Sequence, residues 1–407
     1  MSAMQTLPTV LLRPGEADRV LAGHPWVYQS SIRRLTAPIA DGEVVQVKDH
    51  RQRFIGTGFY NSKSKINVRM LSPERLEVNR AFFESRVQAS LDVRRRYMPD
   101  ATSFRVVNSE SDFLSGLILD KYEDVFVLQL SALGMERRKP EIVSVVEGLF
   151  SPRAIIERSD VASRKFEGME ESVGLLAGAL DNGEVAAKLN GLQFTTNLLA
   201  GHKTGLYLDQ QTNYRLVADA LRQKPGSVVL DCFSFVGGFA VHAAAAGAAH
   251  VHGIEQSADA VQAAARNARD NGVGERCVFE AANVFDWLKA NTTTAPHEKL
   301  IPRYDVIILD PPSFTRNRAS VGDALRGYKE IHLRALKLLK PTGTLVTFCC
   351  SHHVDAATFQ AVIMEAAADV HRVLRRVAVY TQSSDHPVLP VIPETEYLKG
   401  FAFEIAR

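Results

Sequence analysis

The sequence is poor in cysteine and contains no long apolar run. Its 407 residues include four cysteines, and two of these, Cys349 and Cys350, are adjacent. Adjacent cysteines rarely bridge, so this is not the disulfide framework of a small secreted protein. No stretch approaches the roughly 18 apolar residues of a membrane span, and the first residues lack a basic segment followed by an apolar core. These absences predict a cytoplasmic protein that is neither membrane-bound nor exported.

The net charge is also small, and no internal repeat or low-complexity tract is evident. A formal charge of +2 does not by itself indicate nucleic-acid binding. Apolar residues make up 46% of the chain, which is enough for two or three domains with cores of their own.

Three patterns follow one another along the chain. Residues 1–75 hold short alternating runs separated by Gly, Pro and Asp, with strands predicted over 44–47 and 54–59. These runs predict a small β-barrel-like module. Residues 76–186 mix a helical pattern over 80–97 with strand-like runs, which predicts an α+β middle domain. In residues 187–407 strands alternate with helices. This alternation predicts an α/β domain built on a mostly parallel, doubly wound sheet.

The first strand–helix turn of this last domain carries glycines and an acid. It reads Asp-Cys-Phe-Ser-Phe-Val-Gly-Gly-Phe over residues 231–239, so Gly237 and Gly238 let the backbone pass close to a ligand. Glu255 ends the next strand, where a carboxylate can accept both ribose hydroxyls of a nucleoside. The full glycine pattern of dinucleotide-binding proteins is missing. An adenosine-bearing ligand other than a nicotinamide cofactor is therefore favoured, with a simple tight turn as the alternative.

A later strand, residues 304–310, runs into Asp-Pro-Pro-Ser-Phe. Proline fixes its own φ and restricts the residue before it, so this loop forms a stiff rim that can hold a flat ring against Phe314. Such a loop is typical of methyl transfer to a nucleobase, with a rigid turn without a ligand as the alternative. The next strand ends in Thr-Phe-Cys-Cys-Ser, residues 347–351. A thiol at the carboxyl edge of an open sheet is a candidate nucleophile.

In this order, these motifs resemble those of class I S-adenosylmethionine-dependent methyltransferases. One subgroup is similar over nearly the whole chain: the bacterial 23S rRNA cytosine carbon-5 methyltransferases with an N-terminal PUA domain. The segments that carry this further similarity are 24–28, 201–210, 326–329 and 397–401. The resemblance implies a Rossmann-like methyltransferase domain, a PUA-like RNA-binding domain, S-adenosylmethionine as cofactor and 23S rRNA as partner.

The resemblance also implies how the thiol acts. Cytosine carbon 5 is a weak nucleophile, and addition of a thiolate to carbon 6 activates it. The nucleophile of the subgroup falls on Cys350, while Cys349 is predicted to be a packed neighbour, and Asp310 is the second catalytic residue. Ser313 stands where many RNA cytosine methyltransferases have another cysteine, which assists product release. Another group, or water, must do that here.

Further positions follow from the same motifs. The predicted cofactor-binding residues are Lys203, Thr204, Gln210, Asp231, Phe233, Ser234, Gly237, Gly238, Glu255, Asn283 and Asp310. The predicted substrate-binding residues are Pro311, Pro312, Phe314 and Lys329. For Asn283 the alternative is a helix N-cap, and for 201–210 a plain loop; the latter lacks the spacing of a P-loop. Trp26 and Tyr28 either stack on RNA or pack in the PUA core. No metal is expected, because His352 and His353 lack further ligands at suitable spacing.

Two other functions remain open from the sequence. The Asp-Pro-Pro-Ser-Phe loop also resembles that of rRNA guanine methyltransferases, which need no thiol. A noncatalytic RNA-binding or ribosome-assembly factor is the alternative from a different class, against which the glycines, both acids and the cysteine argue. The sequence determines neither the target nucleotide nor the oligomeric state, and a homodimer is one of the states left open.

Overall fold

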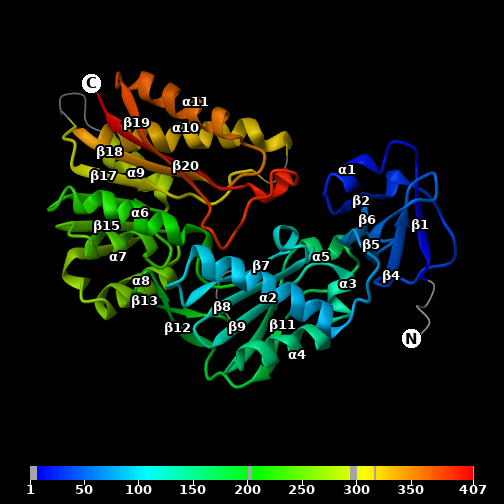
Figure 1. Ribbon diagram of the computed structural model, residues 1–407. Helices are drawn as coiled ribbons and strands as arrows, with labels where there is room; N and C mark the ends of the chain where they lie inside the picture. Colours follow the sequence, from blue (N-terminus) through cyan, green and yellow to red (C-terminus); the bar gives the residue numbers. More distant parts are fainter. Residues whose placement is uncertain (1–6, 200–203, 294–299, 316–317, 407) are drawn as a thin grey trace. The chain divides into compact units, whose positions relative to one another are not determined.

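The computed structural model describes residues 7–199, 204–293, 300–315 and 318–406 (Figure 1). These residues form two compact units. Unit 1 takes in the described residues of Met1–Lys188, Thr196–Leu208 and Ser384–Thr395, and unit 2 those of Leu189–Thr195, Asp209–Ser383 and Glu396–Arg407. Unit 1 thus combines the two predicted N-terminal domains, whose boundary near residue 76 stays a prediction.

The first sheet of unit 1 has six strands in the order β2-β6-β5-β4-β1-β3. They are β1 (Thr9–Leu12), β2 (Trp26–Tyr28), β3 (Ile32–Leu35), β4 (Val44–Lys48), β5 (Phe54–Tyr60) and β6 (Ile66–Ser72), with the short helices α1 (Asp18–Leu21) and η1 (Gln29–Ser31) between them. Alternating residues of these strands, such as Val45 and Val47, point into a shared apolar core. The strands predicted over 44–47 and 54–59 are confirmed.

The second sheet of unit 1 has five strands in the order β11-β10-β9-β8-β7. They are β7 (Ser103–Asn108), β8 (Leu117–Tyr122), β9 (Val125–Leu130), β10 (Ala154–Ser159) and β11 (Ser172–Gly178), joined by η2 (Ser109–Asp112), α3 (Leu133–Glu136) and α5 (Ser163–Phe166). The helices α2 (Arg80–Tyr97) and α4 (Lys139–Phe150) pack on this sheet through residues such as Phe83 and Val145. Helix α2 spans the predicted residues, and the Asn79 side chain caps it by accepting the Phe82 N–H at 3.1 Å.

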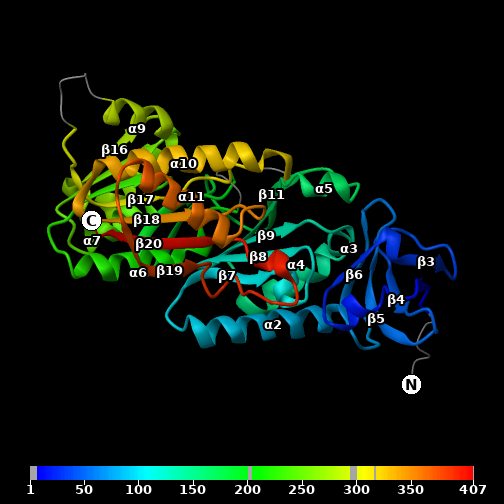
Figure 2. The same ribbon diagram turned by 90° about the horizontal axis from the view of Figure 1, so that it is seen from above.

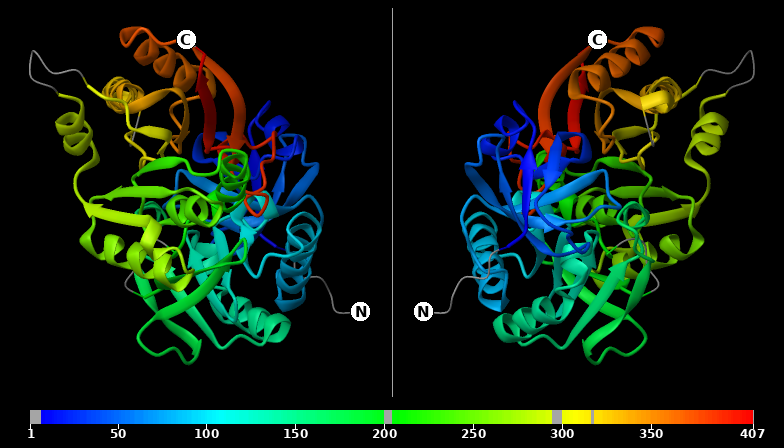
Figure 3. Two further views of the ribbon diagram at one scale, coloured as in Figure 1. Left: turned by 90° about the vertical axis from the view of Figure 1, so that its left-hand side faces the viewer. Right: turned by 90° about the vertical axis from the view of Figure 1, so that its right-hand side faces the viewer.

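A two-stranded sheet of β12 (Glu184–Leu189) and β13 (Leu192–Asn197) follows. Unit 2 then contains a seven-stranded sheet in the order β16-β15-β14-β17-β18-β20-β19. Its strands are β14 (Val228–Cys232), β15 (His250–Glu255), β16 (Cys277–Ala281), β17 (Tyr304–Leu309), β18 (Leu339–Cys349), β19 (Leu374–Thr381) and β20 (Lys399–Ile405). Strands β14 to β18 are parallel, while β20 pairs antiparallel with both β18 and β19. Figure 3 shows the β19–β20 pair in orange and red.

Helices cover both faces of the seven-stranded sheet (Figures 1 and 2). One layer holds α6 (Gln211–Arg222), α7 (Gly238–Ala245) and α8 (Ala258–Asp270), and the other α9 (Val284–Thr292), α10 (Val321–Leu338) and α11 (Ala356–Asp369). Short turns η3 (Leu208–Gln210), η4 (Gly274–Arg276), η5 (Arg318–Ser320) and η6 (Pro393–Thr395) complete the elements. The Rossmann-like fold predicted for this part of the chain is confirmed.

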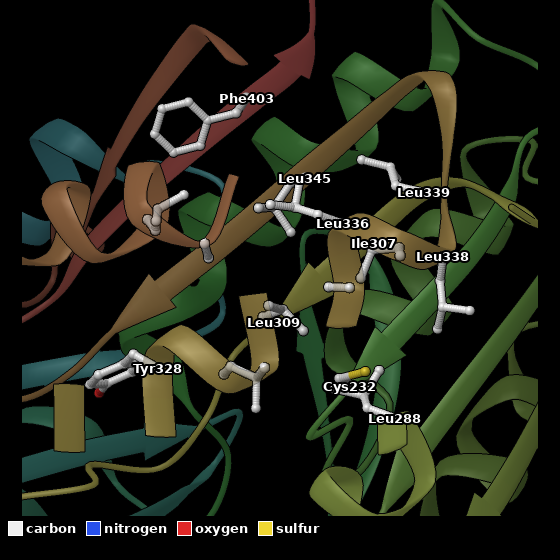
Figure 4. Packing of buried hydrophobic residues seen from close by; sticks show 14 of the residues in the cluster. Cys232, Leu288, Ile307, Leu309, Tyr328, Leu336, Leu338, Leu339, Leu345 and Phe403 are labelled. Atoms are coloured by element: carbon white, nitrogen blue, oxygen red, sulfur yellow. The ribbon is translucent and has the colours of Figure 1, made fainter. Parts of the chain in front are cut away.

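The core under α9, α10 and α11 fixes the carboxyl ends of β17 and β18. Figure 4 shows Leu309 at the end of β17 and Leu345 on β18, with Tyr328 and Leu336 of α10. All four side chains are fully buried. Interiors packed in this way leave little freedom, so the loops that leave these strands start from fixed positions.

Residues 384–395 leave unit 2 and belong to unit 1, although they lie between β19 and β20 in the chain. Asp385 accepts the Arg105 N–H at 2.9 Å, and its carbonyl accepts Arg94 Nη2 at 2.8 Å. Farther along, Glu394 lies 3.2 Å from the buried His24 ring. These contacts join residues nearly three hundred or more positions apart in sequence, which no local pattern could indicate.

Trp26 has a structural partner within unit 1. Its indole Nε1 donates to Glu110 Oε1 at 3.0 Å, and the Arg69 guanidinium lies 6.0 Å from its ring centroid. Trp26 and Tyr28 are half-buried in β2. The bond to Glu110 leads to η2 rather than into the apolar core of the first sheet, so RNA stacking and core packing both stay predictions for Trp26. None of the helices in the described part of the chain combines the length and the apolar character of a membrane span.

Candidate active site

The turn after β14 is held in an unusual backbone conformation. Phe233, Phe235 and Gly237 all have positive φ, at 65°, 48° and 85°. Two consecutive N–H groups, those of Phe233 and Ser234, donate to the Ile254 carbonyl on the neighbouring strand at 2.9 and 3.1 Å. Positive φ in two non-glycine residues costs free energy, and such conformations cluster at ligand sites.

The two glycines of this turn are needed for different physical reasons. Gly237 needs its left-handed conformation, in which a side chain is strained. At Gly238 a Cβ atom would lie 2.6 Å from the Tyr214 ring, so the missing side chain makes room for an aromatic residue of α6. Gly238 is therefore required by packing, and its contact with a cofactor stays a prediction.

Asp231 is the buried acid of the turn. Its side chain is 1% exposed, its Oδ2 accepts the Ala240 N–H at 3.1 Å, and its Oδ1 has no hydrogen-bond partner. Burial raises the pKa of Asp231 to about 7, and the nearby Glu255 carboxylate contributes to this rise. Ser234 Oγ is a second buried polar atom without a well-aligned partner, although its hydroxyl is close enough to oppose the rise in the pKa of Asp231. Unsatisfied buried polar groups are rare in proteins, so this pair indicates a site for a polar ligand.

Glu255 and Asn283 follow the next two strands. Glu255 accepts the Phe235 N–H at 3.0 Å and the Ser257 N–H at 2.9 Å, which holds its carboxylate beside the turn. Asn283 caps α9, since its Oδ1 accepts the N–H groups of Phe285 and Asp286 at 3.0 and 3.3 Å. The N-cap interpretation of Asn283 is thus confirmed, and its binding to the cofactor stays a prediction.

Asp310 is oriented by a chain of amide groups. Gln210 Nε2 donates to Asp310 Oδ1 at 3.0 Å, and Asn213 Nδ2 donates to Gln210 Oε1 at 2.7 Å. Asn213 also donates to the Thr381 carbonyl at 2.9 Å. Both amide side chains are almost fully buried. Because Asn213 fixes which end of the Gln210 amide faces Asp310, the carboxylate is held in one orientation.

The loop after Asp310 rests on an aromatic cluster. Phe314 packs against Tyr328 at 4.7 Å between ring centroids and against Phe285 at 5.5 Å. It also lies 6.4 Å from the ring of Phe233, in the turn after β14. Gly327 has no side chain, and a Cβ atom there would lie 3.3 Å from the Phe314 ring. Phe314 is half-buried, whereas Pro312 is exposed. The structure therefore gives Phe314 a part in supporting the loop, and Pro312 forms its exposed rim.

The Thr-Phe-Cys-Cys-Ser segment ends β18 next to this loop. Cys349 is fully buried in the core, as the sequence predicts, whereas Cys350 is half-buried and its Sγ donates to the Pro311 carbonyl at 3.8 Å. Ser313 Oγ donates to the Thr315 carbonyl at 2.9 Å and lies 2.8 Å from Ser351 Oγ. These bonds tie the end of β18 to the Pro-Pro loop, so the thiol and Asp310 share one edge of the sheet.

Two titratable side chains under this segment are structural. His332 is fully buried, its Nδ1 donates to the Tyr328 carbonyl at 2.6 Å, and its Nε2 accepts from Thr347 Oγ1 at 2.8 Å. Burial lowers the pKa of His332 to about 4, so it is neutral at pH 7. Burial also raises the pKa of the Tyr328 phenol. Both groups therefore stay uncharged at neutral pH.

Of three further predicted residues, the structure describes two. Lys203 lies outside the described residues. Thr204 is buried in unit 1. Lys329 on α10 forms ion pairs with two carboxylates of α11, Glu365 at 3.6 Å and Asp369 at 3.1 Å. The roles of these three residues toward cofactor or substrate stay predictions.

Sequence reasoning missed several members of the site. Asn213, Phe285, Ser351 and Lys399 contribute through contacts across elements, and single side chains on helices or strand ends give no local signal. Lys399 lay within the 397–401 segment that carried the resemblance, but without an assigned role. Among the residues that the structure describes, no group of three or more His, Cys, Asp or Glu side chains could hold a metal ion.

Two protein-family models match separate parts of the chain. A PUA-like domain model matches residues 10–73, and an S-adenosylmethionine-dependent methyltransferase model matches residues 172–396, more than half of the chain. The protein named ribosomal RNA large subunit methyltransferase I from Vibrio vulnificus (strain YJ016) is 35% identical over 97% of this chain and 99% of its own length. The protein of that name from Klebsiella pneumoniae (strain ATCC 700721 / MGH 78578) is 35% identical over 98% of each chain.

Solved structures show the same fold. A structure described as a methyltransferase complexed with SAH has a TM-score of 0.81, with 22% identity over 97% of this chain and 99% of that one. Another, described as a SAM-dependent methyltransferase from Streptococcus mutans, has a TM-score of 0.79, with 21% identity and the same coverage.

Proposed function

The chain belongs to the S-adenosylmethionine-dependent methyltransferases and, among them, to the family of ribosomal RNA large subunit methyltransferase I, and we propose that it methylates carbon 5 of a cytosine in 23S rRNA. In this proposal Cys350 is the nucleophile and Asp310 the residue that holds the base. The PUA-like domain, residues 10–73, would contribute RNA binding.

The observation that carries the cytosine assignment is the placement of the Cys350 thiol. It is half-buried, and it donates to the backbone of the loop that begins at Asp310. Methyl transfer to a guanine nitrogen needs no thiol at this position. A cysteine that is held against the Asp-Pro-Pro loop, next to a fully buried Cys349, fits covalent catalysis on a pyrimidine ring.

The chemistry follows from these positions. The Cys350 thiolate adds to carbon 6 of a cytosine that has been turned out of the stack, and the S–C6 bond forms as electron density moves to carbon 5. Asp310 holds the N3 edge of the ring during this addition. Carbon 5 then takes the methyl group, a base removes the carbon-5 proton, and the electrons of that C–H bond restore the double bond and expel Cys350. Gln210 keeps Asp310 oriented throughout.

The residues at the β14 turn fit S-adenosylmethionine, which supplies an electrophilic methyl group. The unpartnered Asp231 Oδ1 and Ser234 Oγ offer acceptors for its amino group. Glu255, held by the Phe235 and Ser257 N–H groups, offers a carboxylate for ribose hydroxyls. We assign cofactor binding to this set, together with Phe233, whose ring borders the cluster that contains Phe314.

The proposal is tested with rRNA that contains 5-fluorocytidine. Fluorine at carbon 5 cannot leave as a cation, so the methylated adduct cannot release Cys350, and wild-type protein should form an RNA-bound species that survives denaturation. Cys350→Ala should form none, whereas Cys349→Ser, which changes the buried neighbour, should still be trapped. Trapping of Cys350→Ala at the wild-type level would rule out the covalent mechanism.

Nucleoside analysis of methylated rRNA identifies the product base. 5-Methylcytidine is expected, and a methylated guanosine would instead establish the rival activity. Gln210→Ala should slow adduct formation about tenfold, because a hydrogen bond to a charged group contributes on the order of 1.5 kcal/mol. An unchanged rate of trapping would remove Gln210 from the proposed mechanism.

A further inference from the structure

Lys399 is the first residue of β20 and lies opposite Cys349 in the antiparallel pairing with β18. Residues that face each other across a strand pair have neighbouring side chains, so Lys399 reaches the end of β18. Its Nζ donates to the Ser351 carbonyl at 2.5 Å. The ammonium group is thereby fixed to the residue that follows Cys350.

The residues beside Lys399 hold this strand end in place. A Cβ atom at Gly400 would lie 2.5 Å from the Phe348 ring, so only glycine lets β20 approach β18 closely at this point. Two residues before Lys399, the Tyr397 hydroxyl donates to Asp209 Oδ2 at 2.7 Å. The position of Lys399 along β18 is therefore fixed from both sides.

The surroundings of the ammonium group are partly desolvated. Lys399 is half-buried, and burial lowers its pKa, an effect that the neighbouring Cys349 and Cys350 sulfur atoms and the Glu396 and Asp355 carboxylates oppose. The Ser351 carbonyl, which accepts from Nζ, favours the charged form of Lys399. Charges interact more strongly here than in open water.

Other titratable groups lie on the segments around this end of β18. Asp310 begins the loop whose Pro311 carbonyl accepts from the thiol, and the neutral Tyr328 phenol approaches from α10. The Asp355 carboxylate caps α11, where it accepts the Thr358 N–H at 2.7 Å. His352 follows in the chain and packs against Tyr397 at 5.7 Å between ring centroids. The carboxylates and the Pro311 carbonyl disfavour a thiolate, so a cation is needed to oppose them.

We propose that Lys399 is a positioning residue that stabilises the Cys350 thiolate and so sets the pH above which this thiol reacts. The inference rests on the proposed function, in which Cys350 is the nucleophile. Loss of the proton from Cys350 turns its contact with the Pro311 carbonyl from attractive to repulsive, and the fixed ammonium of Lys399 compensates. The same residue anchors the Ser351 carbonyl, so charge and geometry are supplied together.

The test measures the alkylation of Cys350 by iodoacetamide, in which the thiolate forms an S–C bond and iodide leaves. The rate is followed from pH 6 to pH 9.5 by mass spectrometry of the Cys350 peptide, with neither RNA nor cofactor present. Other thiols interfere little, because Cys349 and Cys232 are fully buried and burial raises the pKa of Cys277 to about 12. Cys349 lies in the same peptide as Cys350, so fragment ions assign the alkylated residue.

Three variants separate charge from structure. Lys399→Gln keeps a hydrogen-bond donor for the Ser351 carbonyl but removes the charge, and it should move the midpoint of the pH profile upward by about one unit and slow the reaction about tenfold at pH 7. Lys399→Arg should restore the midpoint to within about half a unit of wild type. Lys340→Met is the matched control, since Lys340 pairs with Asp305 at 2.9 Å toward the other end of β18.

A Lys399→Gln profile that superimposes on that of wild type would overturn the proposal, as would an equal shift in Lys340→Met. A failure of this inference can be told apart from a failure of the proposed function, because the alkylation profiles test Lys399 and the RNA assays test Cys350. RNA methylation by Cys350→Ala would end the covalent mechanism whatever the alkylation profiles show. Conversely, a trapped RNA adduct together with unchanged alkylation in Lys399→Gln would keep the mechanism and remove Lys399 from it.

Discussion

Replacement of Asp231 by asparagine should abolish a specific pH dependence of stability in the unliganded protein. Asp231 is 1% exposed, and only one of its two carboxylate oxygens has a partner. Burial raises its pKa from 3.8 to about 7. Asparagine has nearly the same shape and can still accept the Ala240 N–H, but it does not titrate.

The sign and size of the effect follow from proton linkage. The folded pKa lies above the unfolded one, so the folded state holds the proton more tightly between these values. The contribution of Asp231 to stability is fully present below about pH 4 and is lost as the pH rises toward about 7. One pKa unit corresponds to about 1.4 kcal/mol, so the whole loss is about 4 kcal/mol. The slope is about 1.4 kcal/mol per pH unit between about pH 5 and 6 and falls to about half of that near pH 7.

Urea unfolding followed by tryptophan fluorescence measures this difference. The chain has two tryptophans, and a Trp26→Phe background leaves Trp287, which is buried in unit 2, as the reporter. The unfolding free energy of the Asp231 protein minus that of Asp231→Asn should fall from pH 5 to pH 7 and then level off.

Asp305→Asn is the matched control on the same sheet. The Lys340 ion pair and the Val228 N–H lower the pKa of Asp305 in spite of its partial burial. Its stabilising effect is therefore lost only as the pH falls below 4, and its difference curve should be flat between pH 5 and 8. Parallel curves for the Asp231 protein and Asp231→Asn over this range would refute the assignment of a raised pKa to Asp231.

Three further predictions concern stability. Gly400→Ala should lower the unfolding free energy by about 1–3 kcal/mol in urea titration, because the new methyl group would overlap the buried Phe348 ring; an unchanged midpoint would contradict this. Arg94→Met should cost about 3–5 kcal/mol, since it leaves Asp112 buried without its bidentate partner, and adding Asp112→Leu should recover much of the loss. Asn79→Ala should cost about 1 kcal/mol by removing the N-cap of α2, and a loss near zero would show that the cap contributes nothing.

Much of the fold was predictable because local patterns decide it. The helix over 80–97 and the alternation of strands and helices after residue 228 were recognised from hydrophobic periodicity. Strands β19 and β20 were not. Strand β19 exposes both arginines and valines, so it lacks the alternation of apolar and polar residues that marks a strand. Its antiparallel pairing with β20 places it at an edge of the sheet rather than in the parallel series.

The candidate site divides in the same way. Asp231, Glu255, Asp310 and Cys350 were predicted from sequence because each stands at the carboxyl end of a strand, and parallel strands bring these ends to one edge. Their partners were not found. Asn213, which orients Gln210, lies on a helix whose periodicity explains its position without any reference to a site.

The chemistry expected of this protein can be read from its amino-acid sequence, since the residue types at the strand ends predict a nucleoside-binding turn, a stiff acidic loop and a thiol. The side chains that contact these groups follow from the tertiary structure alone. Lys399 reaches the Ser351 carbonyl because β20 pairs antiparallel with β18, and Trp26 donates to Glu110 across 84 positions of sequence. Such contacts depend on how elements pack, and packing is a property of the whole chain rather than of any local pattern.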